Sequence, residues 1–167
     1  MKHLFSVKLA MSAALLGFLA LGLAPVASAS NTTITTFNVT ATVANICSVT
    51  ATNLAFGTVP ATGAQNTSTI TVTCTPGDAY SVALSAGDSG VENGRFMKGV
   101  TSSNHLSYAL TETSYTGANW GTTAGAVAGT GNGAAQPLNV YGTITAAQAL
   151  AAPVDTYNDT ITVTVTY

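Results

Sequence analysis

The sequence predicts an all-β protein, a β-sandwich of immunoglobulin-like build, and three observations support this prediction. Apolar and polar residues alternate along several short runs, which is the pattern of strands with one buried face. Clusters of Gly, Pro, Asn and Thr separate the runs, as turns at the ends of a sandwich do. Only one short stretch has a helical pattern. Together these features favour a sandwich over a barrel.

The first 29 residues have the features of a secretory signal. Basic residues precede an apolar run over residues 9–26, and residues 27–29 supply the small side chains of a cleavage site. A retained membrane anchor is the alternative, because the run approaches the roughly 18–20 apolar residues of a spanning helix. Pro25 and the lack of flanking charge beyond the run favour the signal. We therefore expect cleavage after residue 29 and export of one domain over residues 30–167.

The remaining chain carries a series of runs in which every second residue is apolar. They lie at residues 37–43, 70–74, 80–84, 106–110, 138–144 and 161–167. Each run predicts a strand with one face in the core. The first of them has two interpretations, because it is either strand A of the chain's own sandwich or an extension free to leave it.

Turn-forming residues fill three intervals between these runs, at 60–66, 87–94 and 117–133. Residues 145–152 have the pattern of a short helix that ends before Pro153, since proline cannot continue a helix.

Charge is scarce, at 6% of the chain. After signal removal two basic residues, Arg95 and Lys98, stand against six acidic ones, a net charge of −4. So few cations cannot neutralise phosphates, which argues against nucleic acid and an anionic membrane surface as partners. We also expect no membrane insertion once the signal has been cleaved. The neutral hydroxyl and amide surface suits packing against further copies of the chain, although an ordinary secreted β-protein has such a surface too.

Two cysteines, Cys47 and Cys74, remain in the exported chain. An even count in an oxidising compartment predicts one disulfide, worth roughly 3–4 kcal/mol in the chain-entropy model. His105 is then the only histidine, so the sequence offers no ligand set for zinc and predicts no metal and no cofactor.

Catalytic groups are equally few, and we expect no enzyme and no catalytic residue. Trp120, with Tyr115 and Asn119 close in sequence, has the composition of a sugar-stacking site, but a single Trp in a sandwich is more often buried. The alternative function is a stand-alone secreted binding module, either lectin-like or a coat or matrix protein.

Several motifs, in order along nearly the whole mature chain, resemble those of the spore coat protein U domain family, which includes the subunits of archaic chaperone–usher pili. They are the alternating run 37–43 before Cys47, Leu54-Ala55-Phe56-Gly57, Ile70-Thr71-Val72-Thr73-Cys74 with Tyr80, Asn104-His105-Leu106-Ser107-Tyr108-Ala109-Leu110, Trp120-Gly121, Val140-Tyr141-Gly142, and the closing stretch 157–167.

The resemblance implies an incomplete immunoglobulin-like sandwich that lacks its final G strand. A periplasmic chaperone fills the resulting groove, and the N-terminal segment of the next subunit then replaces the chaperone at an outer-membrane usher. Repetition builds a surface fibre, a homo-polymer or a mixture of pilus subunits, that supports adhesion and biofilm formation. The resemblance therefore implies export through the periplasm to the cell surface.

The resemblance also implies roles for residues of this chain. Residues 30–44 are expected to be the donor segment and residues 45–167 the pilin domain, with the disulfide inside it. Alternate side chains of an added strand enter pockets along an open sheet edge. The expected donor side chains are Phe37, Val39, Ala41 and Val43, and those of the C-terminal strand bordering the groove are Ile161, Val163, Val165 and Tyr167.

Overall fold

The computed structural model describes residues 30–122 and 125–167, so the predicted signal over residues 1–29 lies outside the described residues. The chain divides into two units, Met1–Thr40 and Ala41–Tyr167. The described part of the first unit, residues 30–40, contains no helix or strand, and its apolar side chains Phe37 and Val39 are exposed.

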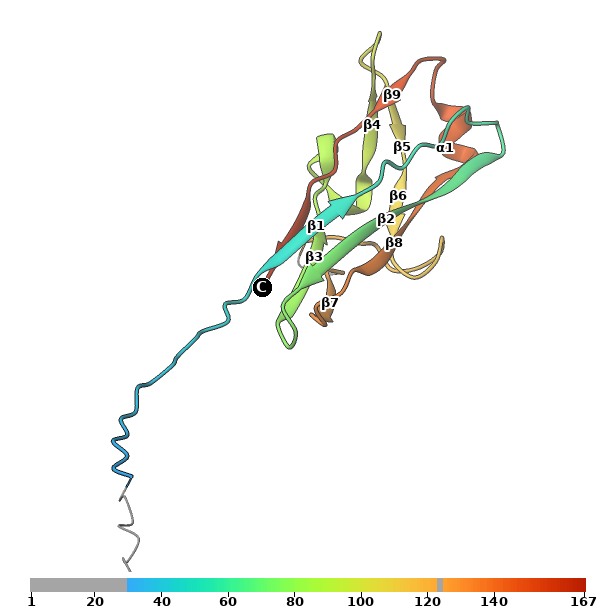
Figure 1. Cartoon of the computed structure of the whole chain (residues 1–167). Coiled ribbons are helices and arrows are strands. Elements are labelled where there is room, and N and C mark those ends of the chain that lie inside the picture. The colour runs from blue at the N-terminus through green and yellow to red at the C-terminus, as the bar shows by residue number, and fades with distance from the viewer. Residues whose placement is uncertain (1–29, 123–124) are drawn as a thin grey trace, which may run out of the picture. The chain divides into compact units, whose positions relative to one another are not determined.

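Most of the regular elements of the second unit are antiparallel strands (Figure 1). In chain order the elements are β1 (Cys47–Ala51), β2 (Gly63–Cys74), β3 (Ala79–Leu84), the single-turn helices η1 (Gly87–Ser89) and η2 (Glu92–Gly94), β4 (Phe96–Gly99), β5 (His105–Ser107), β6 (Ala109–Thr111), β7 (Val127–Thr130), β8 (Gln136–Thr145), α1 (Ala146–Ala151), β9 (Tyr157–Asn158) and β10 (Val163–Thr166). The predicted all-β class is therefore confirmed.

The strands form three antiparallel sheets. The first has the order β1-β2-β8-β6, the second β10-β3-β7 and the third β5-β4-β9. The longest pairing joins β2 to β8, from Gly63 opposite Thr145 to Val72 opposite Gln136. Apolar side chains of β2 and β8 from the first sheet meet those of β3 from the second, and this contact makes the core of a sandwich.

Alternation identifies the core strands because every second side chain faces inward. The buried apolar residues are Ile70, Val72 and Cys74 of β2, Tyr80, Val82 and Leu84 of β3, Leu106, Tyr108 and Leu110 of the β5–β6 run, Trp120, and Val140 and Ile144 of β8. The predicted run 106–110 is one continuous alternation but serves two sheets, since β5 pairs with β4 and β6 pairs with β8.

Two intervals predicted to be turns contain strands. Within 60–66, the turn ends early: the Gly63 amide donates to the Pro60 carbonyl, and β2 begins at Gly63 itself. Within 117–133, residues Val127–Thr130 form β7 beside β3. Gly129 of β7 lies against the Tyr80 ring, where an added Cβ would come within 2.4 Å of Cζ. Gly129 therefore makes room for the Tyr80 ring beside a strand, and it does not mark a turn.

The predicted helix is present as α1. Thr145 precedes it in an extended conformation, its Oγ1 accepts from the Gln148 amide, and the Gln148 side chain accepts from the Thr145 amide. This reciprocal cap satisfies backbone donors at the start of α1. No helix among the residues that the structure describes is long and apolar enough to cross a membrane.

Candidate functional site

Two sheet edges lie next to each other in the second unit. β1 is an outer strand of the first sheet, with β2 as its neighbour, and β10 is an outer strand of the second, with β3 as its neighbour. β1 and β10 contact each other, and Figure 1 shows the C-terminus beside the start of β1. Neither strand is paired on its other side within the described residues, so each edge keeps free N–H and C=O groups.

A cavity of about 1070 Å³ opens next to these edges, between the stretch that follows β1 and the stretch that leads into β10. One wall is Ala51, the last residue of β1, with residues 52–59. The other is residues 152–159 with Ile161 and with Val163, the first residue of β10. Its floor is the core itself, formed by Ile70, Leu84, Leu106, Tyr108, Leu110 and Val140. The hydrophobic core is therefore open along one side, between the two sheets.

The first wall exists because the chain leaves β2 just after β1. At Thr52 the last pairing occurs: its amide donates to the Thr69 carbonyl at 3.0 Å, and its Oγ1 accepts from the Thr69 amide at 3.0 Å. The Ser68 hydroxyl, which is buried, donates to the Thr52 carbonyl. Beyond this point the Asn66 side chain bonds the Ala55 carbonyl, but residues 53–59 form no strand.

Leu54 and Phe56 of this wall turn inward and lie across β8. They do so over Gly142, where a Cβ would come within 2.7 Å of Leu54 Cδ1 and 2.9 Å of Phe56 Cζ. Both side chains remain half-exposed although they pack against the core. They cover part of the opening and leave the rest accessible.

The second wall shows the same incomplete burial. Val163 and Val165 of β10 are half-buried, whereas Val82 and Leu84 on the paired strand β3 have exposed fractions of 0% and 1%. The side chains of β10 and those of β3 both belong to alternating apolar rows, so their difference in burial comes from what packs over them. The apolar row of β10 lacks a neighbour on its open side among the described residues.

A polar network closes one end of the cavity. The Tyr108 hydroxyl donates to Asp159 Oδ2 at 2.6 Å, while the amides of Asp88 and Thr160 donate to Asp159 Oδ1 at 2.8 and 2.7 Å. Burial, then the hydrogen bond to Asp159, raises the pKa of Tyr108. Tyr108 therefore keeps its proton and holds the C-terminal stretch to the floor of the groove.

Asp155 is fixed in a similar way on the same wall. It accepts from the hydroxyls of Ser102 at 2.6 Å and Thr101 at 2.9 Å, and from the Thr156 amide at 2.7 Å. These bonds, with that from Ser102 the largest cause, lower the pKa of Asp155. Among the described residues lining the cavity none is Lys or Arg, so the site suits an apolar strand and not a phosphate or another anion.

The structure places the predicted site residues as follows. Ile161 and Val163 line the cavity, Val165 packs against the core beside it, and Tyr167 is 56% exposed. Phe37, Val39, Ala41 and Val43 are exposed and lie in no strand. Residues 37–43 do not form strand A of the chain's own sandwich, because the first strand, β1, begins at Cys47.

Sequence reasoning missed the first wall of the groove. Leu54 and Phe56 have strand spacing, but the run is only two apolar residues long and ends at Gly57, which has a φ of +67°. The spacing of Leu54 and Phe56 indicates two side chains that face inward. Nothing in this spacing indicates that the backbone of these residues leaves the sheet.

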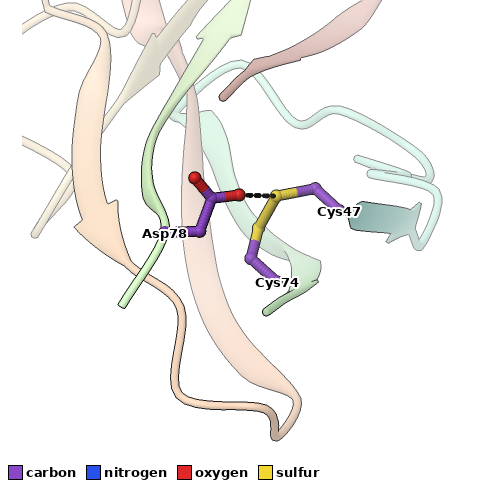
Figure 2. Close-up of side chains that lie close together, drawn as sticks. All are labelled: Cys47, Cys74 and Asp78. Atoms are coloured by element: carbon purple, nitrogen blue, oxygen red, sulfur yellow. Dashed lines mark hydrogen bonds between the residues drawn. A yellow bond between two sulfur atoms is a disulfide. The ribbon is translucent and has the colours of Figure 1, made fainter. Parts of the chain in front are cut away.

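Cys47 and Cys74 form the predicted disulfide, directly opposite each other on β1 and β2. Figure 2 shows the carboxylate of Asp78 facing the bridge, with Oδ2 3.7 Å from Cys47 Sγ. A bridged sulfur has no proton to donate, so this is a polar contact and not a hydrogen bond. The three side chains lie within metal-ligand reach of one another, but bridged sulfurs are not the thiolates that bind metals.

Trp120 is a core residue, with an exposed fraction of 1% and its Nε1 donating to the Val82 carbonyl at 2.8 Å. It is therefore not available to stack on a sugar. His105 is exposed and stacks on Phe96, with ring centroids 4.0 Å apart.

Comparisons with known proteins agree with this architecture. A search of curated proteins finds no match. Among solved structures, the chain is similar to a chain of the CsuC–CsuE chaperone–tip adhesion subunit pre-assembly complex from the archaic chaperone–usher Csu pili of Acinetobacter baumannii, with a TM-score of 0.59 and 23% identity. The match covers 75% of this chain and 41% of that one, so this chain spans about two fifths of the solved chain's length.

At that level of identity the structural match establishes the fold. The family is established separately, because the model of the Spore Coat Protein U domain matches residues 33–164, which is most of the sequence. The chain therefore belongs to the spore coat protein U domain family.

Proposed function

We propose that the chain is a structural subunit of a chaperone–usher pilus and that the groove between residues 51–59 and 152–163, next to the free edges of β1 and β10, accepts a strand from another polypeptide. The observation that carries the proposal is the open core, a cavity of about 1070 Å³ next to two unpaired strand edges. An extended peptide satisfies both needs of such a site, because its backbone pairs with the free edges and alternate side chains cover the apolar floor.

The donor in the fibre is the leading segment of another copy or of another pilus subunit. Residues 30–44 supply alternate apolar side chains at Phe37, Val39, Ala41 and Val43, all exposed, and carry no charge. A periplasmic chaperone holds the groove before assembly, and an outer-membrane usher passes the subunit to the cell surface. The resulting fibre serves adhesion and biofilm formation. The similarity to a chaperone–subunit complex supports these partners.

The function requires no catalysis. The clustered carboxylates of the groove are held by internal hydrogen bonds, and the one acid–tyrosine pair at its floor is a structural contact.

A single charge in the donor segment tests the proposal. Val39→Asp places a carboxylate in an apolar pocket and is expected to abolish the ladder of polymers on unboiled gels of the exported full-length chain. Thr40→Asp is the matched control, since it adds the same charge one residue away on the alternate face and should assemble normally.

The acceptor side has an equivalent pair on β10. Val163→Asp, which faces the cavity, is expected to block assembly, and the exposed Thr164→Asp is not. Folding of every variant is checked by formation of the disulfide. Normal ladders from both Val39→Asp and Val163→Asp would show that the groove does not receive this segment.

A further inference from the structure

The junction between the leading segment and β1 is held by one side chain, Thr75. Its Oγ1 accepts a hydrogen bond from the Ile46 amide at 3.2 Å. It also lies 3.3 Å from the carbonyl oxygens of both Ala44 and Ile46, and its single hydroxyl proton is shared between these two acceptors. The Thr75 amide also donates to the Ile46 carbonyl at 3.0 Å. Three backbone groups of residues 44–46 are therefore bound to one threonine.

Thr75 itself sits on a firmly held turn. Its carbonyl accepts from the Asp78 amide at 3.1 Å, and Gly131 packs so closely on it that a Cβ there would come within 2.2 Å of the carbonyl oxygen. One residue earlier, Cys74 is bridged to Cys47. The partner of residues 44–46 thus has little freedom to move with them.

These contacts extend the β1–β2 pairing by one residue beyond Cys47, so residues 44–46 continue in line with β1. The groove is lined by Ala51 and residues 52–59, at the end of β1 that lies away from Cys47. For the chain's own leading segment to enter it, the chain ahead of Cys47 would have to reverse direction, and a hairpin close to β1 would use residues 44–46. That reversal breaks the bonds to Thr75.

Without such a restraint, self-insertion would compete strongly with assembly. A segment joined to its own groove through a three-residue turn has an effective concentration in the millimolar range, far above that of a second copy in dilute solution. Something in the fold has to oppose the closed monomer if the chain is to polymerise.

We infer that Thr75, next to the Cys47–Cys74 bridge, is a positioning residue that keeps residues 44–46 in line with β1 and so reserves the groove for the leading segment of a second copy. The inference rests on the proposed function. It assigns to the threonine hydroxyl the choice between a closed monomer and an open chain that polymerises.

The test compares the full-length chain with three variants, each exported, purified with its disulfide intact and refolded at one dilute concentration. Thr75→Val removes the hydroxyl and keeps the shape, and Thr75→Ser keeps the hydroxyl. Thr73→Val is the matched control, because Thr73 lies two residues before Thr75, near the end of β2, and is also half-buried, and its hydroxyl makes no side-chain hydrogen bond within the described residues. Polymers are counted on unboiled gels, and protection of the segment is measured by chymotrypsin cleavage at Phe37.

For Thr75→Val we expect the ratio of monomer to polymer to rise roughly fivefold, the change that loss of about one net hydrogen bond produces, with Phe37 protected in the monomer. Thr75→Ser and Thr73→Val should behave as the unaltered chain does. Equal polymer yields from Thr75→Val and the unaltered chain would overturn the inference and leave the proposed function standing.

Two outcomes with the unaltered chain also decide the matter. A monomer with Phe37 protected means that self-insertion occurs despite Thr75, which overturns the inference alone. A monomer with Phe37 readily cleaved and no polymer overturns the proposed function, and the inference with it.

Discussion

Arg95 is a charged side chain with an exposed fraction of 0%. Its guanidinium donates to the carbonyl oxygens of Ser85 at 2.8 Å, Trp120 at 2.7 Å and Glu92 at 3.1 Å, and to Asn119 Oδ1 at 3.0 Å. Burial lowers the pKa of Arg95, but an arginine remains protonated in proteins. The buried positive charge is therefore stabilised by the hydrogen bonds to these acceptors. Arg95 thereby ties the end of β3 to the loop that carries Trp120.

Replacing Arg95 with methionine is expected to lower the free energy of unfolding by about 3–5 kcal/mol, because several buried carbonyl groups lose their donors together. Urea unfolding of the refolded, disulfide-intact chain measures the loss. Lys98→Met is the control: Lys98 pairs with Asp88 at 3.3 Å on the surface, and such a pair contributes at most about 1 kcal/mol. Similar losses from the two variants would contradict this account of Arg95.

Carboxylates give the molecule a defined pH dependence. Hydrogen bonds lower the pKa of Asp155, chiefly that from Ser102, and lower the pKa of Glu92, chiefly that from the Thr122 hydroxyl. A group whose pKa is lower in the folded than in the unfolded chain stabilises the fold above its unfolded pKa, about 4, and loses that contribution as the pH falls through the folded value.

We therefore expect the urea midpoint to be constant from neutral pH down to about 5 and to fall below about 4. Asp155→Asn should start from a lower midpoint at neutral pH and show a shallower acid decline, because the titrating group is gone. An unchanged acid profile in Asp155→Asn would exclude Asp155 as a contributor.

The elements around the groove show what local pattern can and cannot predict. Alternation located β3, β8 and the second half of β2, because one face of each is buried. It missed β1, where four of five residues are exposed and no buried face repeats. It also missed β4 and β7, since neither Phe96-Met97-Lys98-Gly99 nor Val127-Ala128-Gly129-Thr130 alternates apolar and polar residues.

Residues 53–59 are the element on which the open core depends, and Gly142 of β8 allows their position. Gly142→Val would place side-chain carbons where Leu54 and Phe56 now lie, so we expect the segment to be displaced and the free energy of unfolding to fall by about 1–3 kcal/mol. Urea unfolding measures the loss, and Asn139→Thr, at an exposed site of the same strand, should have little effect. Wild-type stability in Gly142→Val would show that the segment is not packed against β8.

At the scale of the whole molecule, the second unit is a sandwich with two adjacent edges unpaired and its core accessible between them. Composition and alternation predicted the sandwich from single strands, since burial of one face is a local property. The groove could not be predicted in that way, because it results from two distant stretches, 52–59 and 152–163, that line one cavity. Only the family resemblance led to the expectation of a missing strand.

A free strand should compete with assembly by mass action. An excess of a synthetic peptide with the sequence of residues 33–43 is expected to occupy open grooves and shorten the polymers in proportion to its concentration. The distribution of polymer lengths on unboiled gels measures the effect. The same peptide with Val39→Asp is the control and should leave the lengths unchanged; equal shortening by both peptides would argue against occupancy of the groove.

The placement of the groove next to the free edges of β1 and β10 has a mechanical consequence. A strand seated there runs alongside both edges, so tension along its length loads every inter-strand hydrogen bond at once, in shear, whereas a strand peeled from one end would lose them singly. If fibres form as proposed, their rupture by pulling requires many bonds to fail together, so such a fibre would resist flow although each junction is non-covalent.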